Sequence, residues 1–263
     1  MAANVASALR AVDALEILVL VDNATDSLSS VPAGVINENA SLRDHGGGLV
    51  EAVKRIHAAN GGRRVPFHAN EGMFVTRANS LPGGGVIAFR DVPKAAELTA
   101  AGADVVISPD ARLLLDDHFY LSGEIPRVTP YEHGFPGHLK RAADGVSWEP
   151  DPLLLDERYL AVNVKGKGAV IFSMCSHAGI VNVLTHARAA FAGTALHAVI
   201  GGFHLAGPTV EPAILETVRD LLGFGLKRII PAHCTGWRAF TAMANAAPED
   251  VLVPSAVGRR FLF

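Results

Sequence analysis

The chain has 263 residues, of which 49% are hydrophobic and 19% charged, so it can build a large core and is not intrinsically disordered. Its formal net charge is −3 and it has no basic run, which argues against a nucleic-acid-binding protein. The apolar run at 15–21 is too short to cross a membrane, and two cysteines cannot build a disulfide scaffold. We expect a globular cytoplasmic protein with a small-molecule substrate and neither a nucleic-acid nor a membrane partner.

The first half of the chain predicts short strands and two helices around a long loop. A leucine- and valine-rich run that stops at Asp-Asn predicts a buried strand at 16–23, and the Ser-, Asn- and Gly-rich residues 24–48 predict a loop. Apolar residues at helical spacing predict a helix over 49–60. The remaining elements expected in this half are strands at 64–69, 84–89 and 103–108, a helix at 93–101 and an ordered excursion at 119–138.

The second half alternates strands with helices. Two apolar runs around a glycine-bearing turn at 165–168 predict a hairpin over 159–177. Beyond it we expect helices at 180–191, 211–225 and 237–247, with strands at 195–204 and 226–236 between them. This alternation indicates an α/β layered fold. We expect a single domain over 1–263, with halves of about 1–140 and 150–263 that meet in the proline- and glycine-rich stretch 133–152.

Three strand-to-loop junctions in the second half end in histidine, at His177, His204 and His233. Each junction is followed by a helix and a returning strand, so we expect these imidazoles at one edge of one sheet, where ligands gather in open α/β folds. A fourth junction carries Asp44 and His45 just before the helix expected at 49–60. Four histidines and an aspartate form a ligand set that suits zinc, iron or manganese.

Structural roles compete with these interpretations. A single histidine at a strand end is more often a hydrogen-bonded structural residue than a ligand. Cys175 and Cys234 could act as soft ligands or reactive thiols, but ordinary burial is the commoner role for either one alone. Arg127 could contact an anionic substrate group, since a guanidinium suits phosphate or carboxylate, or could form an ion pair with Glu124 or another acid. The other histidines are interpreted as structural or surface residues, at 57, 68, 118, 133, 138, 186 and 197.

Taken together, seven motifs resemble the metallo-β-lactamase superfamily, and within it the branch related to dihydropterin–ribofuranosylaminobenzene-phosphate synthase. They lie at 44–49, 122–127, 164–168, 175–180, 201–205, 231–237 and 254–258, and the resemblance runs from about Leu15 to the end of the sequence. It implies an αββα sandwich with a metal site at one edge of its two sheets. It also implies an enzyme that hydrolyses or rearranges a small substrate, which can be phosphorylated, through a metal-bound water.

The chain departs from the family's first metal motif, His-x-His-x-Asp-His. Asp44 and His45 match its second half, but Ala40 and Leu42 stand at the two preceding histidine positions. Few residues separate the strand expected at 16–23 from this motif, which predicts an internal deletion and an incomplete N-terminal sheet.

The resemblance assigns roles to the remaining site residues. It implies that Asp44, His45 and His233 form the second metal position, where Asp44 could also orient the attacking water as a catalytic residue. It leaves His177 as the surviving ligand of the first position and puts His204 where many relatives carry a bridging aspartate. We therefore expect one bound ion, zinc or else iron or manganese, rather than two.

Two functions from different classes fit these motifs. The first is a metal-dependent hydrolase or pterin-related synthase-like enzyme. The second is a catalytically impaired homologue or truncated isoform with a binding or scaffold role, which Ala40 and Leu42 favour. An incomplete sheet would leave apolar surface and a strand edge uncovered, so we expect the chain either to associate as a homodimer or to be poorly soluble.

Overall fold

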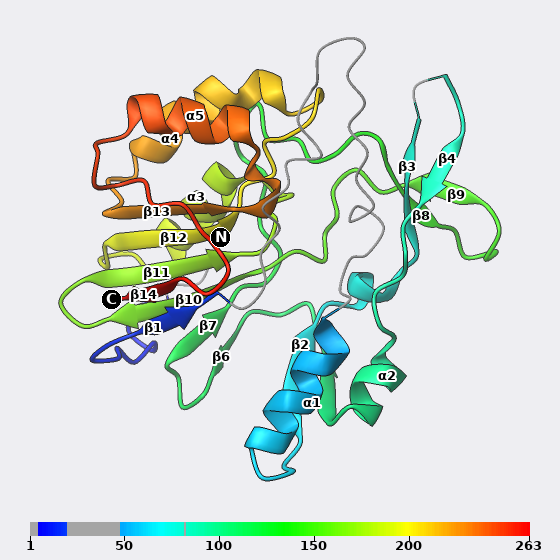
Figure 1. The fold of residues 1–263 in the computed structure, drawn as a ribbon, viewed down its shortest axis with the longest axis horizontal. Helices are drawn as coiled ribbons and strands as arrows, with labels where there is room; N and C mark the ends of the chain where they lie inside the picture. The colour runs from blue at the N-terminus through cyan, green and yellow to red at the C-terminus, as the bar shows by residue number, and fades with distance from the viewer. Residues whose placement is uncertain (1–4, 20–47, 82) are drawn as a thin grey trace. The chain divides into compact units, whose positions relative to one another are not determined.

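The computed structural model describes residues 5–19, 48–81 and 83–263, which form two compact units (Figure 1). Unit 1 draws on Met1–Ile36, Asp110–Gly134 and Glu157–Phe263, and unit 2 on Asn37–Pro109 and Phe135–Asp156. The chain passes between the units more than once, so they are not the sequential halves expected at 1–140 and 150–263. The middle segment 110–134 belongs with the C-terminal residues because its strands pair with the hairpin that begins at Tyr159.

Unit 1 is built on a six-stranded mixed sheet with the strand order β13-β12-β11-β10-β7-β6. Strands β11, β12 and β13 run parallel to one another, whereas β10, β7 and β6 are each antiparallel to their neighbours. The strands span Arg112–Leu114 (β6), Phe119–Leu121 (β7), Tyr159–Val164 (β10), Gly168–Ser173 (β11), Leu196–Gly202 (β12) and Arg228–Ala232 (β13).

The hairpin expected over 159–177 is confirmed as β10 and β11. Tyr159 pairs with Ser173 and Val164 with Gly168, and the turn between them contains Gly166 at a φ of 75°. The alternation that follows is also confirmed, with helices α3 (Ile180–Ala190), α4 (Ile214–Leu222) and α5 (Trp237–Ala246) between and after the parallel strands. Short 3₁₀ helices, η3 (Glu211–Ala213) and η4 (His233–Thr235), precede α4 and follow β13.

The two faces of this sheet bury different sets of side chains, because alternate strand residues point to opposite faces. One face packs against α3, α4 and α5, and its cluster includes Val199, Leu184 and Met243, all fully buried. The other face carries Val170 and Ile230 and packs against the two-stranded sheet of β1 (Glu16–Leu18) and β14 (Arg260–Leu262), which lie side by side in Figure 1. Each fully buried aliphatic side chain contributes about 1.5–3 kcal/mol, so these faces hold the strand ends in place.

The first strand differs from the expected buried strand at 16–23. It spans only Glu16–Leu18, and its partner is β14 near the C-terminus. Glu16 and Leu18 are exposed and Ile17 is half-buried, because a two-stranded sheet covers the core with one face only. Residues 20–23, like the loop expected at 24–48, fall outside the described residues apart from Gly48.

Unit 2 contains a small α/β layer and an antiparallel sheet. Strands β2 (Val65–Ala69) and β5 (Ala103–Ile107) pair in parallel, and helices α1 (Leu49–Ala59) and α2 (Ala95–Ala100) contribute the buried Val53 and Leu98 to its core. The second sheet has the order β4-β3-β8-β9. Its strands, and the 3₁₀ helix that precedes them, span Glu71–Phe74 (η2), Arg77–Ser80 (β3), Val86–Ala88 (β4), His138–Arg141 (β8) and Trp148–Pro150 (β9).

The helices expected at 49–60 and 93–101 and the strands expected at 64–69, 84–89 and 103–108 are thereby confirmed. The excursion expected at 119–138 begins as β7 and ends where β8 starts. Within the described ranges, every helix is too short or too polar to span a membrane.

Candidate metal centre

The three histidines expected at one sheet edge do lie there. Strands β11, β12 and β13 are adjacent and parallel, and their final residues are in register, with Ser173 opposite Gly201 and Gly201 opposite Pro231. Each strand is closely followed by a histidine, since His177 and His204 lie in the loops after β11 and β12 and His233 begins the 3₁₀ helix η4 after β13. The rings of His177 and His204 meet edge to face, with centroids 4.6 Å apart and an interplanar angle of 76°.

Both cysteines join this cluster. The ligand atoms of Cys175, His177 and His204 all lie within 4.8 Å of one another, and those of Cys175, His233 and Cys234 do the same. The Cys175 Sγ atom lies 3.3 Å from Nε2 of His233. Around a tetrahedral zinc ion, with Zn–S near 2.3 Å and Zn–N near 2.0 Å, neighbouring ligand atoms are roughly 3.5 Å apart. The donor types and their spacing therefore fit such an ion.

The loop after β11 is held in an unusual backbone conformation. Ser176 has a φ of 54°, in the left-handed region that is sparsely populated by residues other than glycine. Its hydroxyl donates a hydrogen bond to the Gly202 carbonyl at 2.6 Å and shares another with the Ser173 hydroxyl at 2.8 Å. His204 also has a positive φ, of 45°. Such strained residues concentrate at functional sites, where surrounding contacts hold them.

A buried carboxylate fixes the same loop from another segment. Glu157, whose side chain is 7% exposed, accepts hydrogen bonds from the backbone N–H groups of His177 at 2.8 Å and Ala178 at 2.7 Å. Burial raises the pKa of Glu157, while the charge of His177 and these backbone bonds act in the opposite direction. The carboxylate thus sets the path of the chain through His177.

A second buried carboxylate holds the beginning of helix α3. Glu132 accepts hydrogen bonds from the backbone N–H groups of Val181 at 2.9 Å and Asn182 at 2.8 Å, in the first turn of the helix. An anionic group is favourable there because the helix dipole is positive at its N-terminus. Burial nevertheless raises the pKa of Glu132 to about 7, against the effect of these backbone bonds. Glu157 thus fixes the loop at His177, and Glu132 fixes the start of the helix that follows this loop.

The two thiols differ in acidity. Hydrogen bonding with Cys234, and further bonds with the histidines of the cluster, hold the pKa of Cys175 well below its usual range, although burial opposes this. The pKa of Cys234 is raised, by burial and then by its neighbour Cys175. Burial also lowers the pKa of His204. Cys175 is therefore the more readily ionised thiol, and His204 favours the neutral imidazole.

Comparisons with known proteins place this arrangement in context. No protein-family model matches the chain. It is 29% identical over 211 residues to 7,8-dihydropterin-6-methyl-4-(beta-D-ribofuranosyl)-aminobenzene-5'-phosphate synthase of Methanocaldococcus jannaschii, which covers 79% of this chain and 68% of the relative. An uncharacterized protein of the same organism is 29% identical over 131 residues, or 50% of this chain and 45% of that protein.

A solved structure decides the fold. The chain superimposes with a TM-score of 0.60 on the crystal structure of a metal-dependent hydrolase of the beta-lactamase superfamily, at 20% sequence identity, over 76% of this chain and 71% of the other. The chain has a metallo-β-lactamase-like fold. The family resemblance and the fold class predicted from the motifs are confirmed. The predicted internal deletion falls outside the described residues and stays a prediction.

Within this metallo-β-lactamase-like fold, the remaining predicted site residues have different outcomes. Asp44 and His45, together with Ala40 and Leu42, lie outside the described residues. Arg127 is half-buried, and burial lowers its pKa while the carboxylates of Glu157 and Glu124 act in the opposite direction. Arg127 is therefore close enough to interact with the charge of Glu157, the carboxylate that fixes the loop at His177. Its contact with a substrate anion stays a prediction.

The residues that sequence reasoning missed are the two carboxylates, Glu132 and Glu157. Each is brought to the loop by tertiary packing from a segment that has no histidine motif, so no local pattern identified it. The cysteines carried a weak signal, because each is adjacent to or two residues from a histidine of the cluster. We expected each to be simply buried, whereas the structure places both thiols against the imidazoles.

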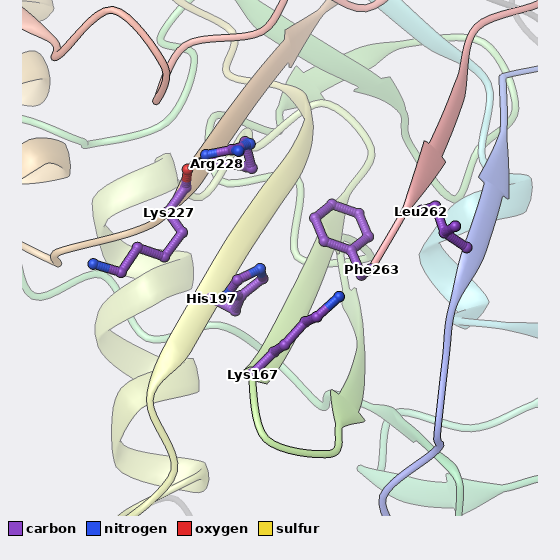
Figure 2. A pocket seen from close by; sticks show the side chains of 6 residues that line it. All are labelled: Lys167, His197, Lys227, Arg228, Leu262 and Phe263. Carbon is purple, nitrogen blue, oxygen red and sulfur yellow. Dashed lines mark hydrogen bonds between the residues drawn. The ribbon is translucent and has the colours of Figure 1, made fainter.

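A cavity of about 380 Å³ lies at the opposite ends of the same parallel strands (Figure 2). Its surroundings are basic, since burial and then the charges of Lys167, Arg228 and Lys227 lower the pKa of His197. Figure 2 shows the Lys227 ammonium group pointing away from His197 and Phe263, so the cations do not converge on one point. The cavity is lined by Lys167, His197, Lys227, Arg228, Leu262 and Phe263, and it contributes nothing to the histidine cluster.

Proposed function

We propose that the chain is a metal-dependent enzyme whose metal ligands include His177, His204 and His233. The observation that carries this proposal is that imidazoles from three adjacent, parallel strand ends surround Cys175, with His177 and His204 in one ligand group and His233 in the other, in a fold where such an edge holds ligands. Asp44 and His45, which the resemblance assigns to the same site, would complete the ligand set. Zinc, or else iron or manganese, suits imidazole and carboxylate donors.

The chemistry divides between the metal and the chain. When bound, a divalent ion supplies Lewis acidity and lowers the pKa of a coordinated water to near 7. The chain's own contribution is to hold the ligands in place before binding, through the hydrogen bonds of Glu157 to the His177 loop and of Glu132 to helix α3. Asp44 would orient the attacking water.

The substrate we propose is a small molecule with a phosphate group. The synthase of Methanocaldococcus jannaschii has a 5'-phosphate in its name, and Arg127 offers this chain a guanidinium of the kind that binds phosphate. Both reaction types implied by the resemblance, hydrolysis and a synthase reaction, are compatible with this substrate class. An Arg127→Gln variant should raise KM for a phosphate-bearing substrate more than it lowers kcat.

The competing proposal is a homologue that binds metal or ligand without turnover. Ala40 and Leu42 favour it, because the family's first metal position would then lack two imidazoles. The two proposals differ in activity rather than in metal binding, so both measurements are needed on one preparation.

The test compares His204→Ala with His133→Ala, an exposed histidine outside the cluster. Each protein is loaded with zinc, iron(II) or manganese and assayed with phosphate monoesters, phosphodiesters and the reaction that forms the product named in the relative. We expect turnover that falls at least a hundredfold in His204→Ala and is unchanged in His133→Ala. Metal binding without turnover on any substrate would favour the binding protein. Failure to bind any of the three metals would overturn the proposal.

A further inference from the structure

We propose that Cys175 is itself a metal ligand, so that the site binds its ion through a thiolate sulfur as well as through imidazole nitrogens. This inference rests on the metal site of the proposed function and adds a ligand that defines the class of ion. A site with sulfur and nitrogen donors selects thiophilic ions such as zinc over manganese or magnesium, which prefer oxygen.

The two ligand groups share Cys175. Cys175 belongs to the group with His177 and His204 and also to the group with His233 and Cys234. Whichever group an ion occupies, it meets the Cys175 sulfur. Removal of Cys175 takes away the one donor that both groups share.

The Cys175 side chain is held ready for this role. The preceding strand β11 ends at Ser173, and the following Ser176 is anchored to the Gly202 carbonyl by its hydroxyl. Glu157 then fixes the backbone at His177 and Ala178. The thiol therefore sits between two rigid attachments, and its sulfur is already 3.3 Å from Nε2 of His233.

The second thiol is placed differently, which provides a matched control. The Cys234 Sγ atom lies 3.5 Å from the backbone carbonyl of Cys175, to which it donates a hydrogen bond. Cys234 also belongs to one of the two ligand groups only. Loss of Cys234 therefore leaves Cys175 and the three histidines in place.

Binding would be a simple exchange at sulfur. The S–H bond of Cys175 breaks, a sulfur–metal bond forms, and the proton leaves to solvent, as it does when thiols bind metals elsewhere. Neither sulfur nor metal changes oxidation state, so no oxidant or reductant is required.

The test is a titration of metal-free protein with cobalt(II), followed by absorption spectroscopy. Cobalt replaces zinc in such sites, and a sulfur ligand adds a charge-transfer band in the near ultraviolet that nitrogen and oxygen ligands do not. We expect this band in the wild type and in Cys234→Ser, and its loss in Cys175→Ser. Cobalt affinity should also fall by more than about 100-fold in Cys175→Ser, beyond the roughly 10–100-fold that removal of a supporting group alone costs.

The outcomes separate this inference from the proposed function. Cobalt that binds to the wild type without the sulfur band overturns the Cys175 assignment and leaves the histidine site standing. A band that survives in Cys175→Ser but is lost in Cys234→Ser also overturns it. No cobalt binding at all overturns the proposed function itself.

A second measurement on the unmodified chain covers the case in which Cys175→Ser fails to fold. The wild type is treated with iodoacetamide with and without saturating zinc, and alkylation of each cysteine is followed by peptide mapping. We expect zinc to slow alkylation of Cys175 at least tenfold, because a coordinated sulfur is no longer a free nucleophile. Equal alkylation of Cys175 with and without bound zinc would contradict the proposal.

Discussion

Cys175 Sγ lies 3.3 Å from His233 Nε2, although the two side chains follow strands β11 and β13, which are separated by β12. The Cys175 and His233 side chains meet beyond the end of β12, the strand between them. Gly202, the last residue of β12, has no side chain there, and a Cβ atom would lie 2.5 Å from both His233 Nε2 and Cys234 Sγ. The close approach of the cluster thus depends on a glycine.

Gly202→Ala should weaken metal binding by displacing His233 and Cys234. Gly202 has no positive φ, so the backbone tolerates alanine, and the added methyl group should cost about 1–3 kcal/mol in overpacking. We expect at least a tenfold lower zinc affinity, measured by competition with a chelating dye. Gly137→Ala, where a Cβ atom meets only the Ser80 Oγ atom at 3.4 Å, is the control and should bind as the wild type does. Equal affinity in both variants would show that the middle strand does not shape the site.

His233→Ala should abolish the stabilisation of the chain by metal. An ion at about 100 times its Kd stabilises the native state by about 2.7 kcal/mol, which corresponds to roughly 5–10 °C in Tm for a chain of this size. The variant should lose this shift in differential scanning calorimetry with and without zinc, while its metal-free Tm changes less.

The matched control for that measurement is His133→Ala. His133 is exposed, whereas His186, on helix α3, shares a 2.9 Å hydrogen bond with the hydroxyl of the buried Tyr159 and would lower stability for another reason. The control should keep the full metal-induced shift. If His233→Ala keeps it as well, the site does not use His233.

Glu157→Gln should destabilise the fold by about 1–3 kcal/mol. The carboxylate accepts two backbone N–H groups, and an amide offers only one oxygen, which leaves a buried donor without its acceptor. Urea unfolding, monitored by circular dichroism, measures the change. Glu249→Gln, at an exposed glutamate, should be neutral. A neutral effect at both positions would show that Glu157 does not fix the His177 loop.

Glu132 should make stability depend on pH. Burial raises its pKa to about 7, above the ordinary value of 4.5, so the native state binds more protons than the unfolded state between these two values. The free energy of unfolding should therefore fall as pH rises from 4.5 to 7 and level off above it, by up to about 3 kcal/mol from this group.

The Glu132→Gln variant isolates that dependence, because glutamine does not titrate. The difference in unfolding free energy between wild type and variant should change across pH 4.5–7 and stay constant above it. Chemical denaturation at a series of pH values measures this difference. A difference that is independent of pH would mean that the Glu132 pKa is not raised.

The sequence identified those site residues that directly follow a predicted strand. His177, His204 and His233 each stand just beyond an apolar run, and the alternation of strands with helices predicts parallel neighbours that end at one edge. The strand expected at 16–23 is confirmed only over Glu16–Leu18, and its exposure was not predicted, because hydrophobicity alone does not reveal that its partner is a strand near the C-terminus.

The sequence patterns did not predict the tertiary contacts between distant segments. Glu132 reaches the first turn of helix α3 from 49 residues earlier in the chain, and Glu157 reaches His177 from 20 residues earlier. Neither carboxylate lies in a recognisable metal or capping motif. The burial that shifts their pKa values arises only when these segments pack together.

Elemental analysis of the purified chain tests the central claim most directly. The protein is loaded with zinc, iron(II) or manganese, dialysed against a mild chelator, and its metal content is measured beside that of His233→Ala. We predict one tightly bound ion per wild-type chain, because Ala40 and Leu42 occupy two histidine positions of the family motif, and none in the variant. Two equivalents would contradict the single-ion site. A wild-type chain that retains no stoichiometric metal would contradict the account as a whole.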